Sequence, residues 1–181
     1  MKKSGQIIFF MLFGISFLLS GCAPTFCSLN CTAPTNTPSV NQTMIEDFAQ
    51  QEVNLMPKGN IVKIVLPADR FFQPGSALFK KNKKSTLAQV AQFMKAYGKT
   101  ATVQILGFTD MLSSDEQNKK LSEARARAVL VYFWTQGLDA NHLYAAGYGS
   151  EHLVGDPNNV SANAANRRVE IIINAHCTTC F

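Results

Sequence analysis

An acid and an arginine stand fifteen positions apart in the stretch from Gly107 to Val129, and together they could bind a ligand that carries both charges. Asp110 follows an apolar run with the pattern of a buried strand, and Arg125 lies in a long polar segment with the pattern of a helix. A guanidinium offers a planar donor pair to a carboxylate, and a carboxylate pairs with an ammonium group. The pair therefore suits a zwitterion, although the spacing alone favours a simpler explanation, a structural salt bridge between loop and helix.

The elements that would hold this pair follow from periodicity and breaker residues. We expect strands at residues 60–66, 101–106, 143–148 and 169–174, and helices at residues 85–97 and 114–136, each helix followed by a glycine. Ser85 and Ser113 or Ser114 are the expected helix caps, and residues 40–56 are expected to form an irregular helix. Alternating strands and helices predict an α/β fold (an α+β sandwich) of βαβαβ type, with a mixed sheet, right-handed crossovers and helices on one sheet face.

The long helix would complete the site. Its predicted sheet-facing residues are Leu121, Ala124, Ala128, Val131 and Tyr132. Asn118 and Arg125 are two helical turns apart and therefore share one edge of that helix. Asp110 stands at the carboxyl end of the preceding strand, where ligands of open α/β sheets tend to bind. We therefore expect these three residues to line a common groove.

Residues 1–21 are predicted to be a signal peptide. Lys2 and Lys3 precede an apolar run of about thirteen residues, too short for a membrane span of roughly 20. The ending Leu18-Leu19-Ser20-Gly21-Cys22 resembles the lipobox of bacterial lipoproteins, which implies that Cys22 becomes the lipidated first residue of the mature protein. Ala23 at the next position favours the periplasmic face of the outer membrane by the same resemblance. The alternative is a soluble secreted protein with a free cysteine near its cleavage site.

Residues 22–40 are rich in Pro, Thr, Ser and Asn and are predicted to be an extended tether, and residues 175–181 form a short tail. The remaining thiols are Cys27 and Cys31 in the tether and Cys177 and Cys180 in the tail. An oxidising periplasm favours disulfides, with three connectivities, among which bridges between tether and tail close the longest loops. Four zinc thiolates and a redox-active CTTC are less favoured alternatives.

Composition narrows the function classes. The chain has 17 Lys and Arg against 12 Asp and Glu, and Lys2 and Lys3 would leave with the signal. So small an excess does not indicate nucleic-acid binding. The histidines His142, His152 and His176 belong to no recognisable nucleophilic constellation, so we expect no enzyme, and the sequence indicates no cofactor.

A set of motifs adds a resemblance. They are Thr109-Asp110, Asn118, Leu121-Ser122, Arg125-Ala126, Val129, Gly147-Tyr148-Gly149 and Asn166-Arg167-Arg168-Val169-Glu170-Ile171. In order and spacing they resemble OmpA-like peptidoglycan-binding domains, a family that includes OmpA, Pal and MotB. The likeness covers residues 61–174, within an expected domain at residues 41–174.

The resemblance implies a ligand and roles. The residues matching Asp110 and Arg125 hold the amine and the carboxylate of diaminopimelate in the peptidoglycan stem peptide. Asn118, Thr109 and Arg168 match positions with supporting contacts. Such a site would bind lysine-type cell walls poorly, because lysine lacks the extra carboxylate. Binding at this site would not cleave any bond of the ligand.

Two departures bear on this expectation. Phe108 replaces the usual histidine, so binding would survive if that side chain lies beneath the loop and would weaken if it shapes the pocket. The loop Phe71–Ser76 lacks the acid that relatives often carry. An alternative function is therefore an assembly component of an envelope machine that uses the fold as a protein interface. A second resemblance, to the OmpA-like lipoproteins of Dot/Icm type IVB secretion systems, points the same way.

Overall fold

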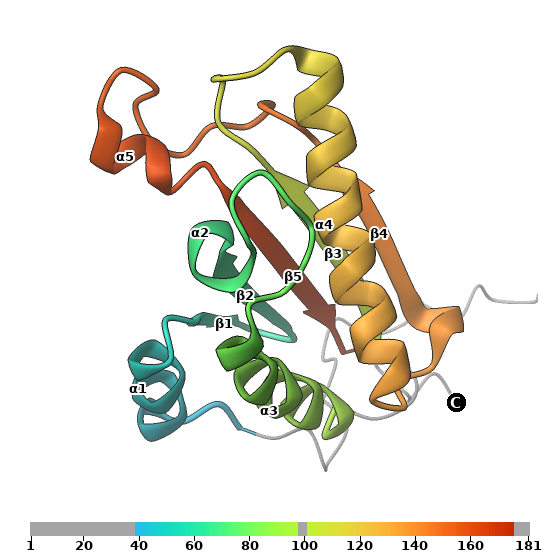
Figure 1. Cartoon of the computed structure of the whole chain (residues 1–181). Coiled ribbons are helices and arrows are strands. Elements are labelled where there is room, and N and C mark those ends of the chain that lie inside the picture. The colour runs from blue at the N-terminus through green and yellow to red at the C-terminus, as the bar shows by residue number, and fades with distance from the viewer. Residues whose placement is uncertain (1–38, 98–100, 176–181) are drawn as a thin grey trace, which may run out of the picture.

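The computed structural model describes residues 39–97 and 101–175, which form a five-stranded mixed sheet with helices packed on it (Figure 1). The strands are β1 (Asn54–Lys58), β2 (Ile61–Pro67), β3 (Thr102–Phe108), β4 (Leu143–Gly147) and β5 (Arg168–Asn174). The α-helices are α1 (Gln42–Gln50), α2 (Ala68–Phe71), α3 (Lys84–Lys95), α4 (Asp115–Thr135) and α5 (Val160–Ala164). Two short 3-10 helices, η1 (Lys81–Lys83) and η2 (Ala140–His142), precede α3 and β4.

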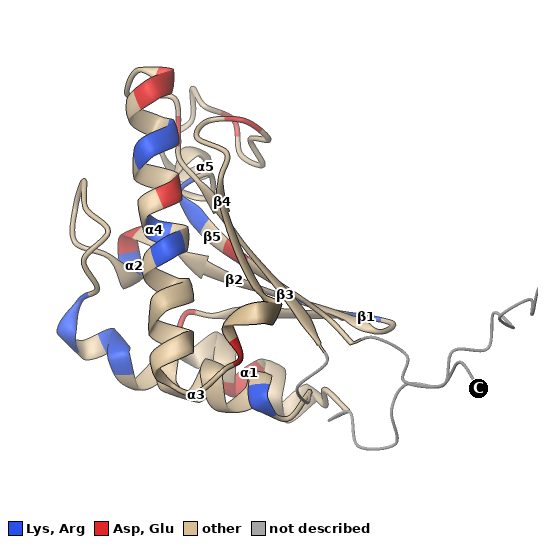
Figure 2. Cartoon of the chain, turned by 90° about the vertical axis from the view of Figure 1, so that its right-hand side faces the viewer, with Lys and Arg blue, Asp and Glu red and all other residues tan. Residues whose placement is uncertain are grey.

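The strand order β1-β2-β5-β3-β4 confirms the expected mixed sheet. β3 and β4 are neighbours and parallel, and they are joined through α4 as one βαβ unit. The last strand, β5, lies between β2 and β3 and is antiparallel to both, so β2 and β3 run parallel and form, with α3 between them in the chain, a second βαβ unit that β5 splits. Figure 2 shows α1, α3 and α4 on the same side of the sheet, as predicted.

Strand β1 was not predicted, because residues 40–56 were assigned to one irregular helix. That helix ends at Gln50, and Glu52 takes a left-handed backbone conformation with φ 65°. Only Leu55 of the strand is buried, which leaves too little alternation for a pattern to reveal. Pro57 fits the assignment, since β1 is an edge strand and proline is tolerated there.

The predicted N-terminal cap is correct for α4 and wrong for α3. Ser114 caps α4 as predicted, with its side chain accepting from the backbone nitrogen of Gln117 at 3.4 Å, and Asp115 follows in the first turn. Helix α3 starts at Lys84, and its cap position has no side-chain hydrogen bond, so the predicted cap at Ser85 was wrong. The 3-10 turn η1 runs directly into α3 and takes the place of a separate cap.

The inner face of α4 differs from the predicted one. Its buried residues are Asn118, Ser122, Arg125, Ala126, Val129 and Phe133. The predicted Ala124 and Val131 are exposed. A Cβ added at Gly107 would stand 2.1 Å from the backbone oxygen of Ser122, and one at Gly147 would stand 2.2 Å from the backbone of α4. Because helix and sheet backbones touch here, small side chains must face the sheet, and a count of apolar residues selects the wrong face.

Several sequence-based expectations concern residues outside the described ranges. These are the signal peptide at residues 1–21, most of the tether, Gly98, and the cysteines Cys22, Cys27, Cys31, Cys177 and Cys180.

Candidate functional site

A pocket of about 420 Å³ lies at one end of three neighbouring strands, β2, β5 and β3. Pro67 at the end of β2 and Phe108 at the end of β3 both pair with Arg168 at the start of β5. The residues just beyond these three strand ends therefore lie together, and α4 forms the other wall. The lining includes four of the five predicted ligand contacts, Thr109, Asp110, Asn118 and Arg125, together with Asp69 and Arg167.

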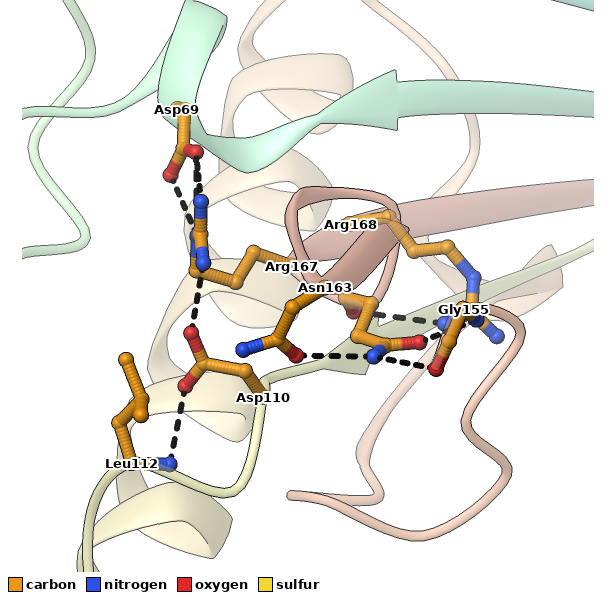
Figure 3. Close-up of polar contacts among 8 residues, drawn as sticks. Asp69, Asp110, Leu112, Gly155, Asn163, Arg167 and Arg168 are labelled. Carbon is orange, nitrogen blue, oxygen red and sulfur yellow. Dashed lines mark hydrogen bonds and ion pairs between the residues drawn. The ribbon is translucent and has the colours of Figure 1, made fainter. Parts of the chain in front are cut away.

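Asp110 is a buried carboxylate, with the residue 7% exposed. Its Oδ2 accepts from Nη1 of Arg167 at 2.7 Å, and its Oδ1 accepts from the backbone nitrogen of Leu112 at 3.3 Å (Figure 3). The neighbouring Thr109 hydroxyl is also buried, and it has no hydrogen-bond partner among the described residues. Buried polar atoms are normally paired. The loop after β3 therefore brings a carboxylate and an unsatisfied hydroxyl to the pocket wall.

Arg125 is a buried cation, only 4% exposed, on the α4 wall. Its Nε donates to the backbone oxygen of Ser76 at 3.0 Å, and its guanidinium carbon lies 5.5 Å from the centre of the Phe72 ring. Nε is the only guanidinium nitrogen of Arg125 with a hydrogen bond to a described residue. The salt bridge to Asp110 that the sequence favoured is not formed within the described ranges, since Asp110 pairs with Arg167. The donor pair at the end of Arg125 can therefore serve a carboxylate.

Asn118 and Ser122 organise the loops around the pocket. The side-chain nitrogen of Asn118 donates to the backbone oxygen of Ser113 at 3.0 Å and so fixes the loop that enters α4. Ser122 Oγ accepts from the backbone nitrogen of Gly149 at 2.9 Å, and the oxygen of Gly149 accepts from the backbone nitrogen of Thr109 at 2.7 Å. The serine and glycine motifs therefore connect α4, the loop after β4 and the loop after β3.

Arg168 does not line the pocket, and Figure 3 shows it directed away from Asp110. Its Nε donates to Glu170 at 2.8 Å, and its guanidinium carbon lies 4.0 Å from the centre of the Phe108 ring. Phe108 stacks in turn on Tyr148, with ring centres 5.5 Å apart. The residue that replaces the family histidine therefore lies beneath the loop and outside the pocket lining.

Asp69 and Arg167 line the pocket but were missed from the sequence. Arg167 donates from Nε to both oxygens of Asp69 at 3.0 Å, and from Nη2 to Oδ2 at 2.6 Å. Asp69 follows β2 by two residues, just as Asp110 follows β3, and that signal could have found it. The choice between Arg167 and Arg168 depends on where β5 begins, because neighbouring residues of a strand point to opposite faces.

The four charged side chains of the pocket influence one another. The hydrogen bond from Arg167 holds the pKa of Asp69 below its ordinary value of 3.8. Hydrogen bonds to Asp69 and Asp110 raise the pKa of Arg167. Burial lowers the pKa of Arg125, although Asp69 and Asp110 act in the opposite direction. Two carboxylates and two guanidinium groups thus balance in formal charge, and a zwitterion would preserve that balance.

Neither a metal site nor a membrane helix occurs in the part of the chain that the structure describes. No group of three or more His, Cys, Asp or Glu side chains there could hold a metal ion. No helix within residues 39–97 and 101–175 is long and apolar enough to cross a membrane.

Known proteins resemble the chain in both sequence and structure. It is 34% identical over 123 residues to outer membrane protein A of Bordetella avium, which covers 68% of the chain and 63% of that protein. It is 33% identical over 121 residues to the probable lipoprotein YiaD of Escherichia coli, covering 67% of the chain and 55% of that protein. The chain thus spans just over half to under two thirds of the lengths of these relatives.

One solved structure is similar along almost its whole length. It is described as the cell wall anchor of the T6SS from Pseudomonas aeruginosa, and the likeness has a TM-score of 0.67 at 25% identity, covering 77% of this chain and 99% of that one. The model of the OmpA family matches residues 71–167, which is more than half of the chain. Family membership also supports the expectation that the protein binds a ligand and is not an enzyme. On the evidence of fold, motifs and relatives together, this protein belongs to the OmpA family.

Proposed function

We propose that this protein binds peptidoglycan noncovalently through the diaminopimelate residue of the stem peptide. The observation that supports it most directly is Arg125, a buried guanidinium whose terminal nitrogens have no acceptor among the described residues, in the same pocket as the buried Asp110. The ligand carboxylate would accept hydrogen bonds from the free donor pair of Arg125. The ligand ammonium group would donate to an oxygen of Asp110. The unsatisfied hydroxyl of Thr109 would then gain a polar partner.

The supporting residues divide into two groups in this proposal. Asn118 lines the pocket and also holds the loop that enters α4, so it contributes to shape and polarity together. Arg168 is assigned to the support of the loop, because its guanidinium is taken up by Glu170 and the Phe108 ring.

The decisive test uses purified sacculi of two chemistries, one with diaminopimelate and one with lysine in the stem peptide. The full-length protein in detergent should sediment with the first and much less with the second. Arg125→Lys keeps the charge but loses the bidentate donor pair, so we expect at least about tenfold weaker binding, as for a lost charge-assisted hydrogen bond. Asp110→Asn should weaken binding similarly, since it removes the partner of the ammonium group.

Arg127→Lys is the matched control. Arg127 lies on the exposed side of the same helix and pairs with Glu123, outside the pocket. It should bind like the wild type. Equal sedimentation of Arg125→Lys and Arg127→Lys would contradict the proposed site, and equal binding to both wall types would contradict the proposed ligand.

We further propose that Cys22 carries lipid and tethers the domain to the periplasmic face of the outer membrane through residues 22–40. The lipobox-like ending supports this, as does the similarity to a probable lipoprotein. Labelled palmitate should enter the wild type and should not enter Cys22→Ser. Label in both proteins would refute the assignment.

A role in an envelope-spanning machine is the second candidate. The full-length likeness to the cell wall anchor of a T6SS supports it. The protein would then anchor a multiprotein assembly to the wall, with disulfides between tether and tail as a further proposed feature. A complex that copurifies with the protein after complete wall digestion would support this role, and recovery of the protein alone would oppose it.

A further inference from the structure

Arg167 lies between two carboxylates in the lining of the pocket (Figure 3). Three of its hydrogen bonds go to Asp69, at 3.0, 3.0 and 2.6 Å, and one goes to Asp110, at 2.7 Å. The three residues come from the ends of β2, β3 and β5, which are neighbours in the sheet. The sheet register therefore fixes this arrangement.

The two carboxylates hold Arg167 unequally. Asp69 receives Nε and Nη2, which form one edge of the guanidinium, whereas Asp110 receives only Nη1 from the other side. The bond to Asp110 can therefore break while the edge-on pair with Asp69 stays intact. The more exposed Asp69, with 48% of its side chain accessible, keeps Arg167 neutralised at the pocket rim, whereas the Asp110 side chain is 9% exposed.

A buried carboxylate needs a cation or donors at all times, because an unpaired buried charge is strongly unfavourable. In the structure Nη1 of Arg167 fulfils that need for Asp110. A ligand ammonium group can fulfil it equally well, and Asp69 then retains the guanidinium. Because Arg167 stays in the pocket with Asp69, the charge of the added ammonium group is balanced by the ligand carboxylate that Arg125 binds.

We propose that Arg167 is an internal stand-in for the ligand ammonium group: it covers Asp110 until a ligand amine replaces it, and Asp69 holds it during the exchange. This inference rests on the proposed function, and it makes Asp69 and Arg167 residues that set specificity. A ligand that offers a carboxylate but no amine cannot displace Arg167 and gains only the contact with Arg125. The site thereby selects for both charges on one side chain.

The test measures binding of three synthetic tripeptides, L-Ala-γ-D-Glu-X, to the full-length protein by calorimetry. X is meso-diaminopimelate, L-lysine, which lacks the second carboxylate, or L-2-aminopimelate, which lacks the second amine. Arg167→Gln removes the competing cation, so we expect the two amine-bearing peptides to bind about three- to tenfold more tightly, with no gain for the aminopimelate peptide. Asp69→Asn leaves Arg167 to Asp110 alone and should weaken the diaminopimelate peptide about tenfold.

The double variant separates this role from a merely structural one. If Asp69 acts through Arg167, Asp69→Asn should have no effect on affinity in the Arg167→Gln background. An unchanged tenfold loss there would overturn the inference, as would weaker diaminopimelate binding by Arg167→Gln. In that second case Arg167 is itself a ligand contact, and the proposed function stands. If neither wild type nor Arg167→Gln binds any of the peptides, the proposed function fails as well.

A second readout requires no substitution in the pocket. In nitrogen-detected NMR of the arginine side chains, the diaminopimelate peptide should free the Nη1 side of Arg167, while its Nε–H stays protected by Asp69. Simultaneous release of Nε–H, or no change at Arg167 on saturation with the peptide, would contradict the exchange.

Discussion

Substitution of Gly107 by alanine tests the close packing of helix on sheet that shapes the whole site. The new Cβ would lie 2.1 Å from the backbone oxygen of Ser122, whereas ordinary contact begins near 3.4 Å. A backbone oxygen cannot rotate away like a side chain, so strand and helix must separate by about 1 Å. Overpacking in a core typically costs 1–3 kcal/mol, and contact with backbone places this case near the upper value, about 3 kcal/mol. With a urea slope of about 2 kcal/mol per molar, the unfolding midpoint should fall by about 1.5 M.

The assay is urea unfolding followed by circular dichroism, with two controls. Gln104→Ala changes an exposed residue of the same strand and should stay within about 0.5 kcal/mol of the wild type. Ser122→Ala added to Gly107→Ala should not restore stability, because the clash is with a backbone atom. A loss below about 0.5 kcal/mol for Gly107→Ala, or rescue by Ser122→Ala, would refute the reasoning that the added Cβ clashes with the backbone of α4.

Three further predictions address single side chains. The lowered pKa of Asp69 means that its contribution to stability is present above about pH 3.8 and is lost as the pH falls through the lower folded pKa. Urea unfolding at several pH values should therefore show that the difference between wild type and Asp69→Asn shrinks below about pH 3.8. Ser122→Ala removes the acceptor of the buried Gly149 amide and should cost about 1–3 kcal/mol, with faster hydrogen exchange at that amide by NMR. Phe108→Leu removes the ring beneath Arg168, so thermal unfolding should show a loss of about 1 kcal/mol or more, while stem-peptide affinity should stay within about twofold.

The sequence predicted the parts of the fold that have strong local signals. The four longer apolar runs became strands within about two residues of their predicted ends, and the cap at Ser114 was correct. The edge strand β1 escaped because a single buried residue creates no pattern, and β5 was correctly placed in the chain but its position between β2 and β3 has no local signature. Strand order is decided by packing across the whole sheet.

In the candidate site, too, the residues with local sequence signals were predicted and those placed by strand register were not. Motif spacing led to Thr109, Asp110, Asn118 and Arg125, all of which line one pocket, because a loop and the following helix are close in sequence. The partner of Asp110 lies 57 residues away in the chain, and only the register of β5 against β3 shows that it is Arg167. The buried face of α4 was misjudged for a related reason. Glycines of two different strands set the distance to that helix, and a helical pattern does not contain them.

The register of the central strands also has a mechanical consequence. β5 pairs along seven residues with β2 on one side and along seven with β3 on the other, from Asn174 at one end to Arg168 beside the pocket. The described chain enters through α1, which packs against β1 beside β2. If the protein holds the wall as proposed, tension between the tether and the bound peptide passes from β2 through β5 to β3. That load crosses both ladders, so it is shared by two sets of seven residue pairs and does not rest on a single contact.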